Sequence, residues 1–159
     1  MPLFKDHIAQ ANSNLVFLEN VNQKIASCHD WQVTICFYTA VHLVNAHLAN
    51  YGLQYRSHEQ VKNALNPETQ LSATKIEEEA YISFVKLQHL SRRSRYLVKD
   101  GDNPPATSET FFTYDKHFAK AIKHLDNLII YFKSKLNIDC NSPTINCIGL
   151  NKSTLQHFK

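Results

Sequence analysis

Four stretches of the chain repeat their apolar residues every three or four positions, which places those residues on one face of a helix. Asp30 is the predicted N-cap of the second stretch, and Gly52 is its predicted C-terminal stop. Between the second and third stretches, Ser57 is expected to cap a short helix that Asn66-Pro67 ends. The predicted helices cover about residues 3–27, 30–51, 57–65, 76–98 and 118–136.

The remaining pattern favours a single helical domain. Strand-like alternation does not persist, no internal repeat appears, and Asn103-Pro104-Pro105 marks the one obvious loop. Helical periodicity stops at Asn137. The predicted fold is therefore all-α: an up-and-down four-helix bundle with an additional short helix over residues 1–136, followed by a loosely attached tail at 137–159.

Composition supports this fold class and excludes several others. The 159 residues include only three glycines, where average usage would give about 11. Tight hairpins, P-loops and dinucleotide-binding folds all need glycine, and neither GxGxxG nor GxxxxGK[ST] occurs. The net charge of +3 is too weak to indicate nucleic-acid binding by itself.

The sequence also predicts a cytoplasmic protein that does not enter a membrane. No apolar run reaches the length of a membrane span, and the start MPLFKDHIAQ lacks the pattern of a secretory signal. Four cysteines are present without a CxxC pair, which favours free thiols.

The second predicted helix has an unusual face opposite its core stripe. Its residues are Trp31, Ile35, Tyr38, His42 and Asn45. Because no helix is expected to be central in a four-helix monomer, an aromatic second face predicts a partner, most simply a second copy of the chain. The alternative is that the short helix and the tail cover this face.

A basic surface is predicted on the third helix, away from its core stripe. Its residues are Arg92, Arg93, Arg95 and Lys99, with Tyr96 among them. Arginines contact phosphates, and a tyrosine stacks on a base, so this surface is a candidate site for RNA or a nucleotide. The alternative is an ordinary solvated helix face.

The histidines are candidates for metal binding and catalysis. HExxH is absent, and the pairs His42/His47 and His117/His124 are spaced too widely to share one ion easily. We therefore predict neither a metal site nor a cofactor, and a metal-binding bundle enzyme with histidines from different helices stays open as an alternative. His58 follows Arg56 on a short connection, where a side chain reaches a ligand readily; its alternative role is helix capping.

Taken together, these residues resemble bacterial members of the HEPN superfamily. The resemblance covers about residues 5–135. It rests on Asp30-Trp31, Thr34, Phe37-Tyr38, Val41-His42-Leu43, Ala46, Leu48, Gly52, Ser57-His58, Tyr81, Leu87, Ser91-Arg92 and Arg95-Tyr96. It implies a compact helical bundle that forms homodimers, in a defence or toxin–antitoxin context, with a nucleotidyltransferase-type protein as a further partner.

Active members of that superfamily resemble one another in an Arg followed four to six residues later by His, and cleave RNA without metal. Here no histidine follows Arg56, Arg92, Arg93 or Arg95 at that distance. The sequence therefore predicts a non-catalytic bundle that binds RNA, a nucleotide or a protein. The alternative is a metal-independent RNase in which His42 or His58 meets Arg92 or Arg95 in space.

Overall fold

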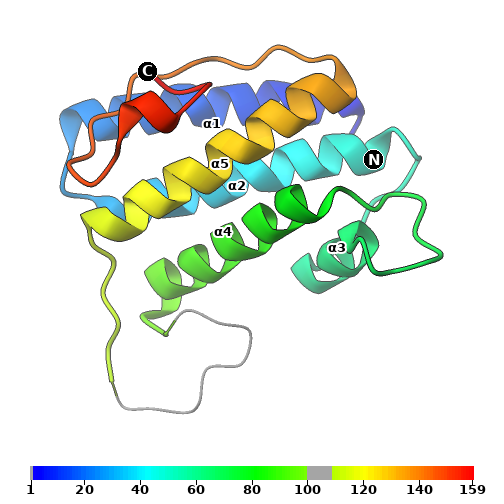
Figure 1. Cartoon of the computed structure of the whole chain (residues 1–159), viewed down its shortest axis with the longest axis horizontal. Helices are drawn as coiled ribbons and strands as arrows, with labels where there is room; N and C mark the ends of the chain where they lie inside the picture. The colour runs from blue at the N-terminus through cyan, green and yellow to red at the C-terminus, as the bar shows by residue number, and fades with distance from the viewer. Residues whose placement is uncertain (1, 100–108) are drawn as a thin grey trace.

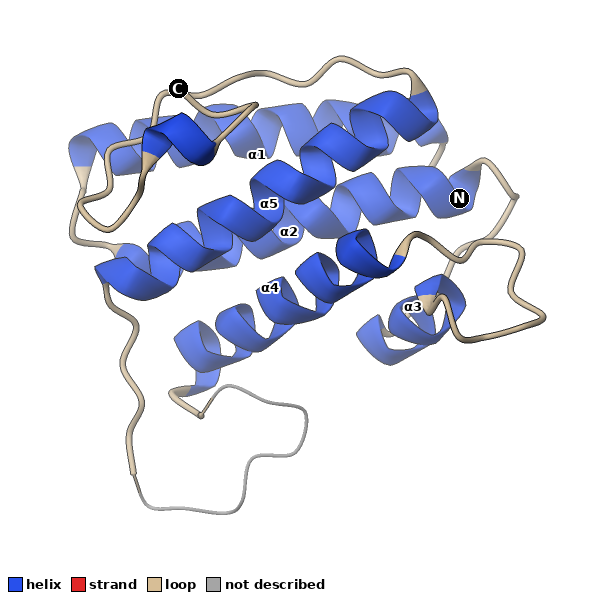
Figure 2. Cartoon of the chain, viewed as in Figure 1, coloured by secondary structure: helices blue, strands red, loops and turns tan. Residues whose placement is uncertain are grey.

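The fold is all-helical in the computed structural model, which describes residues 2–99 and 109–159 (Figures 1 and 2). No strand occurs within these residues, and the loop predicted at Asn103-Pro104-Pro105 lies outside them. The α-helices are α1 (Phe4–Lys24), α2 (His29–Ala49), α3 (His58–Leu65), α4 (Glu78–Tyr96) and α5 (Asp115–Leu136), and a 3₁₀ turn, η1, spans Lys152–Thr154.

Several helix ends differ from the prediction by one to three residues; α5, for example, begins at Asp115 rather than at residue 118. The first helix stops at Lys24, because the next residue, Ile25, is non-helical and 56% exposed, so extending the helix would bury nothing. The N-cap of α2 is Cys28 rather than Asp30. Asp30 lies in the first turn, where its negative charge interacts favourably with the helix dipole. Leu97 and Val98 are not helical, since Leu97 has a φ of 55° and ends α4.

The short helix α3 begins as predicted. Ser57 is its N-cap and its side chain accepts a hydrogen bond from the backbone N–H of Gln60. Ser57 therefore sets the position of His58, the first residue of the helix.

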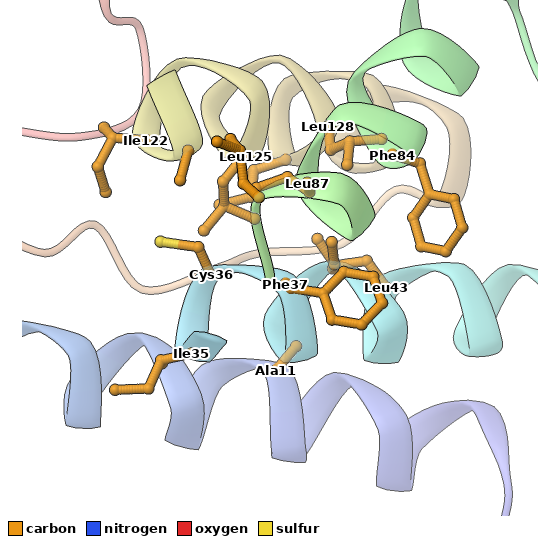
Figure 3. Close-up of a cluster of buried hydrophobic side chains, with 14 of the residues drawn as sticks. Ala11, Ile35, Cys36, Phe37, Leu43, Phe84, Leu87, Ile122, Leu125 and Leu128 are labelled. Atoms are coloured by element: carbon orange, nitrogen blue, oxygen red, sulfur yellow. The ribbon is translucent and has the colours of Figure 1, made fainter. Parts of the chain in front are cut away.

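Helix α2 is the centre of the bundle, contrary to the assumption that no helix would be. It packs against α1, α4 and α5, and α4 also packs against α5. Figure 3 shows α2 with Ile35 directed towards α1, while Phe37 lies on the side of Phe84 and Leu87 from α4. This central position explains why α2 is apolar on both sides: each side is covered by another helix of the same chain.

The segment after α5 is not the loose tail that its lack of periodicity predicts. Ile145, Leu150 and Phe158 are buried, and all three belong to the hydrophobic core. Figure 1 shows this segment returning along α1 and α5. A non-helical segment that packs against helices can bury apolar residues at irregular spacings. Residues 141–158 bury their apolar residues in this way.

Side chains of α1 hold one edge of the segment. Glu19 accepts a hydrogen bond from the backbone N–H of Thr144 at 2.8 Å. Asn22 is buried; its Oδ1 accepts from the N–H of Asn146 at 2.7 Å, and its Nδ2 donates to the carbonyl of the same residue at 2.9 Å.

Helix α5 holds the other edge through two aspartates. Asp115 accepts from the N–H of Gly149 at 3.0 Å. Asp126 is buried and accepts the backbone N–H groups of Gln156, His157 and Phe158 at 3.1, 2.9 and 3.2 Å. The segment thus bridges α1 and α5 by hydrogen bonds to its backbone, and we call residues 141–158 the C-terminal strap.

Candidate functional site

Arg95 is the centre of the strongest candidate site. Its guanidinium carbon lies 6.0 Å from the ring centre of Phe37, 5.9 Å from that of Tyr38 and 5.0 Å from that of Tyr96. Its Nε donates to the carbonyl and to the hydroxyl of Ser91, one turn earlier on α4, at 3.3 and 3.2 Å. A half-buried cation is therefore held in one orientation among three aromatic rings.

His58 shares two of these rings with Arg95. Its imidazole lies edge-on to Phe37, with 5.2 Å between ring centres, and 6.4 Å from the ring centre of Tyr38. Burial lowers the pKa of His58, and the positive charge of Arg95 lowers it further. The structure therefore brings His58 and Arg95 together and favours the neutral imidazole.

A cavity of about 270 Å³ opens beside Arg95. It is lined by Asp30, Trp31, Thr34, Ser94 and Arg95, so the start of α2 forms one wall and the end of α4 the other. Trp31 is 62% exposed and offers a flat apolar surface at this site. We call this cavity, together with His58, Tyr38 and Tyr96, the Arg95 cleft.

The other predicted basic residues do not line the cavity. Arg92 and Arg93 are half-buried on α4, while Lys99 and Arg56 are exposed on connections. Arg93 lies 5.5 Å from the ring centre of Phe111, and its Nε donates to the carbonyl of Phe112 at 2.9 Å. Arg93 therefore holds the segment before α5 against α4 and has a structural role.

His42 contacts a histidine of α1, so its position differs from that of His58, which shares aromatic rings with Arg95. His42 packs between α2 and α1, where its Nδ1 is 3.1 Å from Nδ1 of His7. Burial lowers the pKa of both imidazoles, and the proximity of His7 adds to the effect on His42.

The predicted interaction face of α2 is largely covered within the chain. Ile35 is only 7% exposed and belongs to the core, and Asn45 is half-buried. Trp31 and Tyr38 are the members that remain exposed, at 62% and 37%. What is left of that face therefore coincides with the Arg95 cleft, because helix α1 covers the rest.

Five contributors to the cleft were not predicted as site residues: Phe37, Ser91 and the lining residues Asp30, Thr34 and Ser94. Phe37 was assigned to the core alone, yet its buried ring supports both Arg95 and His58. Asp30 was predicted only as a helix cap, and Ser91 had no predicted role in a site, although it accepts a hydrogen bond from Arg95. Phe37 and Tyr38 are adjacent on the helix, so their side chains point in different directions. The sequence thus indicated that aromatic rings lie outside the core stripe as well as in it.

A second basic area lies where the middle of α4 meets the first half of α5. His124 accepts or donates a hydrogen bond at 3.4 Å to the hydroxyl of Ser83. Burial lowers its pKa, followed by the charges of Lys86, Lys120 and Lys123. These lysines make the surroundings of His124 positively charged.

The described residues hold no group of three or more histidine, cysteine or acidic side chains arranged to bind a metal ion. None of the helices in residues 2–99 and 109–159 combines the length and apolar character that crossing a bilayer requires. Comparison of the chain with protein-family models, with curated proteins and with solved structures finds no match.

Proposed function

We propose that this protein is a non-catalytic, HEPN-like up-and-down helical bundle that binds single-stranded RNA or a nucleotide in the Arg95 cleft. The observation that carries the proposal is the fixed Arg95 guanidinium among Phe37, Tyr38 and Tyr96, next to a cavity lined by Trp31. Proteins that bind single strands combine cationic side chains, which attract the phosphates, with exposed aromatic rings, on which bases stack. The Arg95 cleft offers both within one small surface.

The test is binding of fluorescently labelled single-stranded RNA, measured by anisotropy at several salt concentrations. Arg95→Ala is expected to weaken binding about tenfold, since it removes both a cation and a stacking partner. Arg95→Lys keeps the charge but loses the planar group, so its loss should be intermediate. Lys5→Ala is the matched control, because Lys5 is an exposed cation on α1 outside the cleft.

Two results would contradict the proposal. One is that the unchanged protein does not bind RNA or nucleotides at low salt. The other is that Arg95→Ala and Lys5→Ala weaken binding equally, which would indicate attraction by the overall charge rather than a site.

A second function, metal-independent RNA cleavage, is favoured by the approach of His58 to Arg95. A neutral imidazole accepts the proton of a ribose 2′-OH as the 2′-oxygen attacks the adjacent phosphorus. The bond from phosphorus to the 5′-oxygen breaks, the departing oxygen takes a proton from water, and a guanidinium stabilises the charge on the attacked phosphate. The pKa of His58 is lowered, so the base is in its neutral form at neutral pH.

Incubation of labelled RNA with the protein in EDTA tests this second function. If it is correct, His58→Ala and Arg95→Ala each abolish cleavage, whereas His42→Ala, which alters the histidine packed against α1, leaves cleavage intact. Absence of cleavage in the unchanged protein would leave binding as the function.

The homodimer and the nucleotidyltransferase-type partner stay predictions. If two copies associate, Trp31 and Tyr38 are the exposed residues of α2 that would meet the second copy. Size-exclusion chromatography with light scattering, applied to Trp31→Ala and Tyr38→Ala, tests this: a monomer in the unchanged protein refutes the dimer.

A further inference from the structure

The cavity of the Arg95 cleft has the size and the polar groups to hold a single base. Its volume of about 270 Å³ is below the range of about 300–1,000 Å³ that is typical for drug-sized ligands. A cavity of this volume has room for no more than about one base, so the rest of a strand must lie outside. Trp31, exposed beside the opening, provides the surface on which that base stacks.

The two hydroxyl groups that line the cavity already donate hydrogen bonds to backbone carbonyls. Thr34 Oγ1 donates to the carbonyl of Asp30 at 2.9 Å, one turn earlier on α2. Ser94 Oγ lies 3.0 Å from the carbonyl of Leu90, to which it donates, and 3.0 Å from the hydroxyl of Thr113. The two hydroxyls can therefore only accept from a base, and the charged groups Asp30 and Arg95 provide the stronger contacts.

These two groups have opposite requirements. The guanidinium of Arg95 is a donor only, and the carboxylate of Asp30 is an acceptor only. A base that satisfies both must present acceptors on one edge and two donors on the neighbouring edge. Guanine does so: O6 and N7 accept from an arginine, and N1–H and the N2 amino group donate to a carboxylate.

The other three bases lack this arrangement. Adenine and cytosine each present one amino group next to a ring nitrogen that repels a carboxylate, and uracil presents a single N–H between two carbonyl groups. We propose that the Arg95 cleft selects guanine, read by Asp30 and Arg95 and stacked on Trp31. This inference rests on the proposed function and names the base that the site prefers.

The chain provides its own reporter for the test, because Trp31 is its only tryptophan. A base stacked on Trp31 should quench the tryptophan fluorescence. We would titrate GMP, AMP, CMP and UMP, and, in parallel, labelled oligouridines that carry one central G, A or C. The free nucleotides and the oligonucleotides distinguish a nucleotide site from an RNA site that shares the same base chemistry.

The expected result is quenching by GMP and by the G-containing oligonucleotide at about tenfold lower concentration than by the others. Asp30→Asn should reduce that preference to less than about threefold, because a bidentate contact contributes at least about fivefold to the discrimination between bases. Asp30→Glu keeps the carboxylate and should retain part of the preference. Asp139→Asn, an exposed aspartate outside the cleft, is the matched control, and circular dichroism verifies that each variant is folded.

The failure of this inference is distinguishable from the failure of the proposed function. Anisotropy that shows RNA binding with equal affinity for all bases, or without quenching of Trp31, overturns the guanine site and leaves RNA binding in place. A guanine preference that Asp30→Asn preserves also overturns it. Absence of binding in the anisotropy assay itself refutes both.

Discussion

Replacing Asp126 by alanine should detach the C-terminal strap and destabilise the protein. The buried carboxylate accepts three backbone N–H groups, from Gln156, His157 and Phe158. A hydrogen bond to a charged group contributes about 1.5–3 kcal/mol. In Asp126→Ala the three donors must either stay buried without an acceptor or move into water, which would expose Phe158.

Movement of the three N–H groups into water limits the loss in the free energy of unfolding. Exposing the side chain of Phe158 costs about 1.5–3 kcal/mol, and part of the hydrogen bonding is regained from water. We therefore expect the free energy of unfolding to fall by about 3–4 kcal/mol rather than by the full sum of three bonds. Asp126→Asn keeps one acceptor oxygen, so its free energy of unfolding should fall by less than that of Asp126→Ala.

Urea unfolding followed by far-UV circular dichroism measures this change, and hydrogen exchange at residues 156–158 shows whether the strap has moved. Asp139→Ala is the control: it removes an exposed carboxylate close to the strap and should change the free energy of unfolding by less than about 0.5 kcal/mol. If Asp126→Ala is as stable as this control and exchange is unchanged, the strap is not held by Asp126.

Three further results are expected. Burial lowers the pKa of His7 and His42 below the ordinary value of 6.5, so the unfolded state binds more protons than the folded state. The free energy of unfolding should therefore decrease as the pH falls from about 7 to about 5. Urea midpoints measure this decrease, which should be smaller in His42→Gln. Burial raises the pKa of the Cys36 thiol far above its ordinary value, so iodoacetamide should label Cys36 only after unfolding, as peptide mass spectrometry would show, and labelling in the native protein would contradict this. Leu97→Gly should raise the free energy of unfolding by about 0.5–1 kcal/mol relative to Leu97→Ala in thermal unfolding, because the backbone there has a φ of 55° and glycine adopts it without strain; equal stability would argue against strain.

The helical framework could be predicted because apolar residues recur with the period of a helix. The stripes of α2, α4 and α5 are buried as the pattern indicates, and Ser57 caps α3. Periodicity is weakest at helix ends, where one apolar residue such as Leu97 continues the pattern without being helical. It also does not show which helix is central, since an interface with a partner and burial within the chain both require a second apolar face.

The C-terminal strap could not be predicted by the same reasoning. Its buried residues are irregularly spaced, and its backbone is satisfied by side chains from α1 and α5 rather than by its own helix. Asp126 was the available signal: it is a carboxylate inside the apolar stripe of α5, next to Leu125, and a buried charge needs donors from elsewhere.

The Arg95 cleft was predicted in part. Arg95, His58 and Tyr96 were selected from charge, position on a connection and aromatic character. Their meeting was left as one alternative among several, because His42 and His58 were equally eligible on sequence. The contact of His42 with His7, and the aromatic rings that His58 shares with Arg95, depend on how the helices pack and could not be read from the sequence.

The C-terminal strap has a consequence for how the chain folds during synthesis. Helices α1 and α2 follow one another in the chain and can pair early, but Asn22 on α1 finds its partner Asn146 only after a separation of 124 residues. Until residues 141–158 have left the ribosome, the groove between α1 and α5 is unfilled and its apolar lining faces water. Exposed apolar surface of this kind is prone to aggregation during folding, and docking of the strap covers it.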